Sequence, residues 1–75
     1  MAKNVDVVAP VPGLVANVAV KAGGAVAAGD PVVMLQAMKM EIVVPADHAG
    51  TVEEILVVEG QEVEIGAVLA RIRLG

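Results

Sequence analysis

Length, composition and charge exclude several classes of protein. The chain has 75 residues, enough for one small domain, and its longest uncharged stretch, residues 7–20, is too short and too rich in proline to cross a membrane as a helix, although 57% of the residues are hydrophobic. A net charge of −4 with no basic patch and no aromatic residue argues against nucleic-acid binding, and the absence of cysteine excludes disulfides and thiolate metal sites.

Eight short β-strands are predicted along the chain, separated by turns that contain glycine or proline. In the first half, the predicted strands are residues 4–8, 14–20, 25–28 and 32–36. In the second half, they are residues 40–44, 51–57, 62–65 and 68–74. Valine and other branched residues dominate these segments, and such residues favour strands. The sequence therefore predicts an all-β domain.

An internal repeat relates the two halves. A shift of 37 positions superimposes residues 5–35 on residues 42–72 without any insertion. The glycine pairs that coincide are Gly13 with Gly50, Gly23 with Gly60 and Gly29 with Gly66. Glycine permits positive φ and so fixes turns, which means that the turns repeat as well as the strands. We expect a single domain, residues 1–75, built as a flattened barrel-sandwich of two four-stranded antiparallel sheets with a pseudo-twofold axis.

The second predicted strand of each half carries the same irregularity. Its apolar pattern slips by one residue between Val15 and Val18, and again between Val52 and Ile55. A slip at equivalent positions of both halves predicts a β-bulge, or a bend where the strand passes between sheets.

The junction between the halves is predicted to be a tight hairpin with Met38 and Lys39 in its turn. This register pairs like with like: Ala37 with Met40, Gln36 with Glu41, Leu35 with Ile42 and Val33 with Val44. The neighbouring registers set Gln36 opposite an apolar residue, Ile42 or Val43. Two-residue turns favour Asn and Gly, which tolerate positive φ, and Met-Lys offers neither. A strained turn that exposes a lysine is better explained by function than by folding.

The tetrad Ala37-Met38-Lys39-Met40 resembles the biotin attachment motif of biotin carboxyl carrier domains, which belong to the biotinyl/lipoyl attachment family. The resemblance covers nearly the whole chain, including Pro12-Gly13 before the second strand and Ala46-Asp47 leading to Gly50-Thr51-Val52. Three positions depart from the family pattern: Gln36 stands where Glu is common, Val11 where Met is frequent and Ile42 where a polar residue is usual. None of them removes the acceptor lysine.

The resemblance implies that a biotin protein ligase joins biotin to Lys39 through an amide bond, with Ala37, Met38 and Met40 as the flanking residues of the site. It also implies that the attached biotin moves carboxyl groups from a biotin carboxylase to a carboxyltransferase or decarboxylase, on other domains or subunits. The domain would then be a carrier and not an enzyme. No signal peptide is recognised, so we expect a cytoplasmic protein without membrane insertion.

Two other functions stay open at this point. A lipoyl carrier has the same fold, but its motif typically reads Asp-Lys-Ala, unlike Met38-Lys39-Met40. An unmodified structural module would not need a lysine in a strained turn. An enzyme fits the sequence less well, because His48 is the only histidine and lies in a predicted exposed turn, and no serine or cysteine is present as a nucleophile. The acyl substrate stays open, and a free subunit and a domain of a larger carboxylase both fit.

Overall fold

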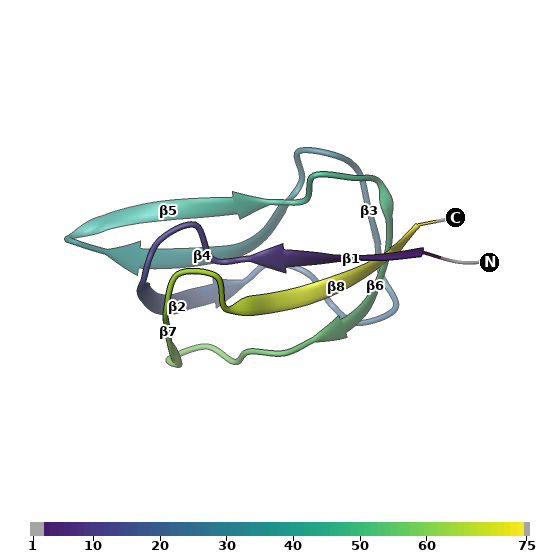
Figure 1. Cartoon of the computed structure of the whole chain (residues 1–75). Helices are drawn as coiled ribbons and strands as arrows, with labels where there is room; N and C mark the ends of the chain where they lie inside the picture. The colour runs from purple at the N-terminus through teal and green to yellow at the C-terminus, as the bar shows by residue number, and fades with distance from the viewer. Residues whose placement is uncertain (1–2, 75) are drawn as a thin grey trace.

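The computed structural model describes residues 3–74, which form eight strands and no helix. The chain therefore offers no helix in this part that is long enough to span a membrane. The strands are β1 (Lys3–Val8), β2 (Gly13–Val18), β3 (Ala25–Val26), β4 (Pro31–Ala37), β5 (Met40–Pro45), β6 (Gly50–Ile55), β7 (Glu62–Val63) and β8 (Val68–Leu74). All pairings between them are antiparallel, as the sequence predicts (Figure 1).

The repeat in the sequence is a repeat in the structure. Each strand of the second half begins and ends 37 positions after its counterpart, so that Lys3–Val8 corresponds to Met40–Pro45 and Pro31–Ala37 to Val68–Leu74. The sheet orders are β1-β8-β6-β3 and β5-β4-β2-β7, and the shift converts one order into the other. Each sheet takes two strands from each half. Neither half therefore has a sheet of its own, and the two halves share one core.

The predicted irregularity of β2 and β6 is a β-bulge in both strands. The pairing of β2 with β4 shifts between Val15 and Asn17, and that of β6 with β8 shifts between Val52 and Glu54. At the bulge, the amide of Val15 donates to the carbonyl of Gln61 at 2.8 Å, and the amide of Val52 donates to the carbonyl of Gly24 at 2.8 Å. Each bulge thus bonds to a loop of the opposite half and fastens the halves together.

The third strand of each half is shorter than predicted, and the second strand ends earlier. Strands β3 and β7 have only two residues each. A tight turn stops β3, because the amide of Ala27 donates to Oδ2 of Asp30 at 2.9 Å and the amide of Asp30 donates to the carbonyl of Ala27 at 3.0 Å. Strands β2 and β6 end soon after their bulges, at Val18 and Ile55. Turn bonds therefore replace sheet pairing after β3. Beyond β2 and β6, single backbone bonds from Ala19 to Val32 and from Leu56 to Leu69, each 2.9 Å long, continue without a regular strand.

The core between the sheets consists of small branched side chains. The largest fully buried side chains are Leu35, Leu69, Ile72, Val15, Val32, Val33 and Val52. Among residues 3–74, no polar or charged side chain is buried. The molecule is elongated, with principal extents of 39 × 17 × 17 Å. The described ends of the chain lie at one end of the long axis, and the hairpin between β4 and β5 lies at the other (Figure 1).

Candidate functional site

The hairpin between β4 and β5 adopts the predicted register. Ala37 pairs with Met40, Gln36 with Glu41 and Leu35 with Ile42. Only Met38 and Lys39 lie between the two strands. Their φ angles are 51° and 65°, both positive, which is the backbone of a type I′ turn. The predicted turn residues, which were chosen by pairing similar side chains across the strands, are therefore confirmed. The predicted backbone strain is present as well, because neither residue is Asn or Gly and both have positive φ.

The strain lies in these two residues. In the part of the chain that the structure describes, every other residue with positive φ is a glycine. A left-handed conformation costs a residue with a Cβ atom roughly 1–2 kcal/mol. Paired strands on both sides of the turn hold Met38 and Lys39 in this conformation. An energetic cost without a structural benefit at the turn itself indicates that the side chains are kept for a function.

Replacing Met38-Lys39 by Asn-Gly should stabilise the domain by about 1 kcal/mol, because Asn and Gly accept positive φ at lower cost. Thermal unfolding of the double variant and the original protein measures the change. The same Asn-Gly pair at Met40-Glu41, two residues further along in β5, serves as the control and should destabilise. A loss of stability in the Met38-Lys39 variant would contradict the strain argument.

The side chains of the turn project into solvent. Lys39 is exposed, and the residues Met38 and Met40 on either side of it are 94% and 65% exposed. Ala37 is buried and lies at the base of the hairpin. A Cβ atom on Gly13 of β2 would lie 2.8 Å from the carbonyl oxygen of Gln36 and 3.3 Å from Cβ of Ala37. Small residues at these positions therefore let β2 support the base of the hairpin closely.

No acidic group holds the Lys39 amine. Within residues 3–74, the ion pairs are those of Arg71 with Asp6 and with Glu54, in the other sheet. The same part of the chain contains no group of three or more His, Asp and Glu side chains arranged to bind a metal. His48 lies in the exposed turn between β5 and β6, as predicted. Lys39 thus presents an exposed amine that has no ion pair among residues 3–74.

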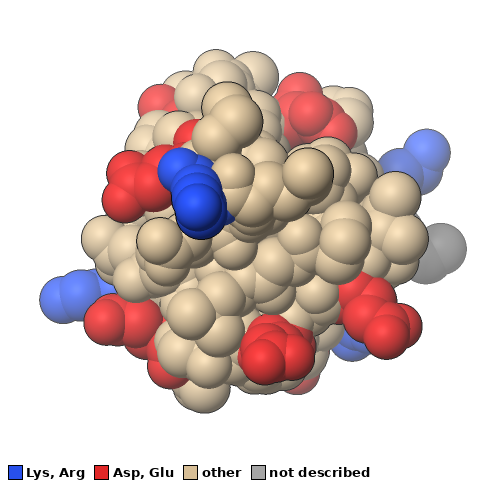
Figure 2. All heavy atoms as spheres, turned by 90° about the vertical axis from the view of Figure 1, so that its left-hand side faces the viewer, with Lys and Arg blue, Asp and Glu red and all other residues tan. Residues whose placement is uncertain are grey.

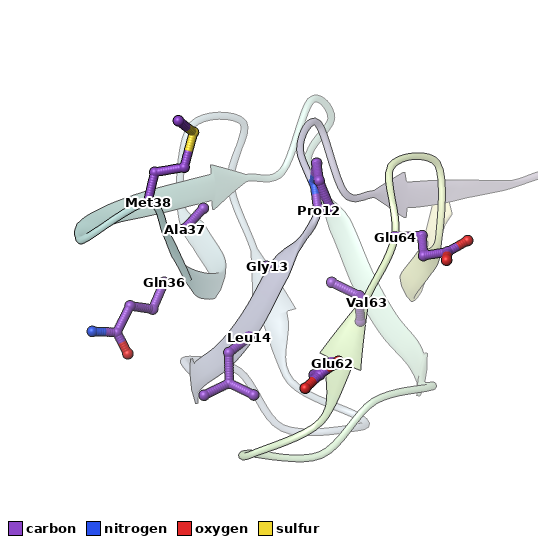
Figure 3. A pocket seen from close by; sticks show the side chains of 9 residues that line it. All are labelled: Pro12, Gly13, Leu14, Gln36, Ala37, Met38, Glu62, Val63 and Glu64. Atoms are coloured by element: carbon purple, nitrogen blue, oxygen red, sulfur yellow. The ribbon is translucent and has the colours of Figure 1, made fainter.

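A shallow groove lies beside the hairpin and was not predicted from the sequence. It has a volume of about 540 Å³, and Figure 3 shows the residues that line it: Pro12, Gly13, Leu14, Gln36, Ala37, Met38, Glu62, Val63 and Glu64. These residues come from β2, the hairpin and the segment around β7. Residues 12–14 and 62–64 are far apart in the sequence, and only the pairing of β2 with β7 brings them together. The local sequence signal for the groove is weak: the exposed Leu14 follows Gly13, where a Cβ atom would lie 2.8 Å from the carbonyl oxygen of Gln36.

The surface around the hairpin is mostly uncharged. Figure 2 shows this end of the molecule, with uncharged surface across its middle and acidic side chains mainly towards the edges. Four of the exposed large hydrophobic residues belong to the β4–β5 hairpin or to β2 beside it: Leu14, Met38, Met40 and Val43. An exposed lysine among apolar side chains suits a surface that other proteins contact.

Comparison with known proteins identifies the family. A family model described as "Biotin-requiring enzyme" matches residues 5–72, which is nearly the whole chain. The chain belongs to this family. The predicted family and the predicted all-β sandwich are therefore confirmed.

Named relatives of the family agree. The chain is 43% identical over 67 residues to the mitochondrial methylcrotonoyl-CoA carboxylase subunit alpha of Arabidopsis thaliana, covering 89% of this chain and 9% of that protein. It is 47% identical over 56 residues to pyruvate carboxylase of Aspergillus niger, covering 75% of this chain and 5% of that protein. A biotin carboxyl carrier protein of Streptococcus mutans is 45% identical over 58 residues, covering 77% of this chain and 45% of that protein.

A solved structure shows the same fold. The crystal structure of urea carboxylase from Kluyveromyces lactis superimposes with a TM-score of 0.89 and 34% sequence identity, over 93% of this chain and 6% of that one. The chain thus spans a small part of the large carboxylases that it matches, and less than half of the carrier protein. It has the size and fold of the biotin-requiring domain and not of a complete carboxylase.

Proposed function

We propose that this chain is a biotin carboxyl carrier domain with biotin attached through an amide bond to Nζ of Lys39. The observation that carries the proposal is the strained type I′ turn, which exposes one lysine at the end of a family domain that requires biotin. The exposed side chains of Met38 and Met40 form the immediate surroundings that a biotin protein ligase would contact. Their flexible, polarisable side chains suit contact with more than one partner.

The residues of the domain fit an attached biotin. A long acyl group on Lys39 meets no steric obstacle, because the amine lies in an exposed turn without an ion pair among residues 3–74. In acylation by biotin adenylate, the bond from Nζ to the acyl carbon forms as the bond from that carbon to the AMP oxygen breaks, AMP leaves and Nζ loses a proton; none of the ion pairs among residues 3–74 gives Lys39 an acceptor for that proton. The ligase would therefore supply the base. The new amide is neutral, so the formal net charge changes from −4 by one unit to −5.

Biotin, when attached, supplies the chemistry of accepting a carboxyl group in one active site and releasing it in another. The domain holds the attachment site, Lys39, in a position from which it can reach a partner. The hairpin lies at the opposite end of the long axis from the described ends of the chain, so those ends do not block the approach of Lys39 to a partner (Figure 1). Tethering of this kind replaces free diffusion with effective concentrations on the order of mM.

The partners that we propose are a biotin carboxylase and a carboxyltransferase or decarboxylase. The relatives in plants and fungi are named carboxylases, and the bacterial relative is named a biotin carboxyl carrier protein. These names favour biotin over lipoate, and nothing among the relatives supports an unmodified structural module. We propose the domain as the carrier part of such an enzyme and not as a catalytic part.

Co-expression with a biotin protein ligase should yield one biotin per chain, on Lys39. Intact-mass measurement counts the added groups, and peptide mapping locates them. The other two lysines, Lys3 and Lys21, are exposed as well and serve as internal controls that should stay unmodified. Biotin on either of them, or lipoate on Lys39 after expression with a lipoate ligase instead, would contradict the proposal.

A further inference from the structure

The internal repeat makes it possible to compare the outer faces of the two sheets position by position. The shift of 37 residues converts one sheet into the other, so equivalent positions have the same backbone environment. A face that meets only water should carry charged or polar side chains at such positions in either sheet. A difference between the two faces therefore reports a difference in what they contact.

The outer face of the β1-β8-β6-β3 sheet is a charged surface. Arg71 of β8 lies between Asp6 of β1 and Glu54 of β6 in the pairing register. Its Nε is 3.4 Å from Oδ1 of Asp6, and its Nη1 is 3.4 Å from Oε1 of Glu54. All three side chains are about half exposed. This row is a typical solvated face with balanced charges.

The equivalent row of the other sheet has no charge. The counterparts of Asp6, Arg71 and Glu54 are Val43, Met34 and Asn17, which lie side by side across β5, β4 and β2. Val43 is 49% exposed, so this row lies at the surface as its counterpart does. The repeat thus keeps the backbone and replaces an ionic row with an uncharged one.

The neighbouring row of the same sheet places acids at its two edges. The register aligns Glu41, Gln36, Leu14 and Glu62 across β5, β4, β2 and β7. Figure 3 shows Gln36, Leu14 and Glu62 pointing to the same side. Three strand spacings separate the two carboxylates by roughly 14 Å. None of these four strands contains Lys or Arg. We call Leu14, Asn17, Met34, Gln36 and Val43 the uncharged face.

Charge selects the occupant of the uncharged face. In the biotinylated domain Lys39 is neutral, so a second copy of the chain would bring Glu41 and Glu62 against the same carboxylates with no Lys or Arg on the four strands to compensate. An anionic lipid surface would be repelled for the same reason. A protein surface with an apolar centre and basic residues on both sides is complementary. A biotin carboxylase has reason to be basic around its active site, because its co-substrates ATP and bicarbonate are anions.

We propose that the uncharged face, with Glu41 and Glu62 at its edges, docks the carrier domain onto the biotin carboxylase component of its enzyme. The inference rests on the proposed carrier function and adds the surface that the partner contacts. The face is continuous with the Lys39 hairpin, since β4 and β5 belong to both. Docking there holds the base of the hairpin against the partner and leaves the lysine arm free to enter the active site.

The first test compares two valines on opposite sheets. Val43 on β5 and Val8 on β1 are 49% and 44% exposed, so Val43→Arg and Val8→Arg are matched variants. The biotin carboxylase of the same organism is the probe, and bicarbonate-dependent ATP hydrolysis is measured against the concentration of biotinylated domain. The arginine in Val43→Arg would be repelled by basic residues of the partner, so this variant should raise KM roughly tenfold or more at unchanged kcat. Val8→Arg should change KM less than twofold.

The second test separates specific from general charge effects. Glu41→Lys with Glu62→Lys should raise KM, while the control pair Asp47→Lys with Glu53→Lys gives the same net charge and should not, because exposed Asp47 follows β5 at the end away from the hairpin and exposed Glu53 lies on β6 of the other sheet. NMR titration of the domain with the carboxylase should shift the amides of Leu14, Met34 and Val43 and leave those of Asn4 and Asp6 unchanged. Equal effects of both charge pairs, or shifts on the β1 face, would overturn the inference.

Other outcomes assign the face differently. A concentration-dependent dimer that Val43→Arg abolishes would assign it to a second copy, and binding to phosphatidylserine vesicles that the same variant abolishes would assign it to a membrane. Both would overturn the inference. Intact-mass measurement separates failure of the docking proposal from failure of the carrier proposal. A chain that takes up no biotin on Lys39 contradicts the carrier proposal. A biotinylated chain that is turned over equally well with Val43→Arg contradicts the docking face alone.

Discussion

Lys39→Arg is expected to abolish biotinylation completely while the domain stays folded. Arginine keeps the positive charge at the turn, but its guanidinium stays protonated and does not accept an acyl group. Because the side chain is exposed, the free energy of unfolding should change by no more than about 0.5 kcal/mol. Intact mass after co-expression with the ligase measures the first effect, and thermal or urea unfolding measures the second.

The matched control for this variant is Lys21→Arg. Lys21 is an exposed lysine in the segment between β2 and β3, so its replacement makes the same chemical change away from the hairpin. It should retain one biotin per chain. Biotin on the Lys39→Arg variant would move the attachment site elsewhere, and unfolding of that variant would show that Lys39 has a structural role.

The positions of the strands along the chain and the hairpin register were predictable because the relevant signals are local or repeated. Leu35 opposite Ile42 and Gln36 opposite Glu41 are pairs within ten residues of one another, so chemical similarity across the turn determines their register. The bulges at Val15 and Val52 were predictable because the same slip occurs twice. A slip in the apolar pattern at equivalent positions of both halves supports a β-bulge more strongly than a single slip, since the same slip is less expected to arise twice by chance.

The groove and the uncharged face were not predictable, because they depend on pairings between distant strands. Leu14 lies beside Glu62 only because β7 of the second half joins the sheet of β2. From the sequence alone, Met34 is an apolar residue of a strand next to the core, and its counterpart Arg71 is an exposed cation. The repeat matches the two positions, but only the register shows that charged residues flank Arg71 across its sheet and uncharged residues flank Met34 across the other. The short strands β3 and β7 also depend on turn bonds that residue patterns do not encode.

Packing beneath the hairpin explains how the domain holds the strained turn at Lys39. The turn of Met38 and Lys39 extends from a hairpin whose inner side chains, Leu35 and Ile42, pack into or against the common core. The cost of two positive φ values is thus offset by strand pairing and apolar burial below the turn. The turn serves the function, and the strands below it supply the stability. Substitutions in the turn should therefore abolish biotinylation without lowering the free energy of unfolding, whereas substitutions in the core below it should lower that free energy.

Leu35→Ala is expected to cause a large loss of stability, because it acts at the base and not at the turn. Leu35 is fully buried and faces Ile42 and Val15 in the strand pairings on either side of β4. Truncating such a leucine typically costs about 2–5 kcal/mol, since the neighbouring side chains only partly fill the cavity. A domain of this size has a total stability near the lower end of about 5–15 kcal/mol. The unfolding temperature should therefore fall by roughly 10 °C or more.

The control for this variant is Leu56→Ala, since Leu56 is a leucine of the same size that lies among the exposed hydrophobic residues after β6. Its replacement should lower the free energy of unfolding by less than about 1 kcal/mol. A fall of only a few degrees with Leu35→Ala would mean that the two sheets do not depend on the packing beneath the hairpin. The strain at Lys39 would then need another source of support, because the base of the hairpin would be too weakly packed to hold two residues with positive φ.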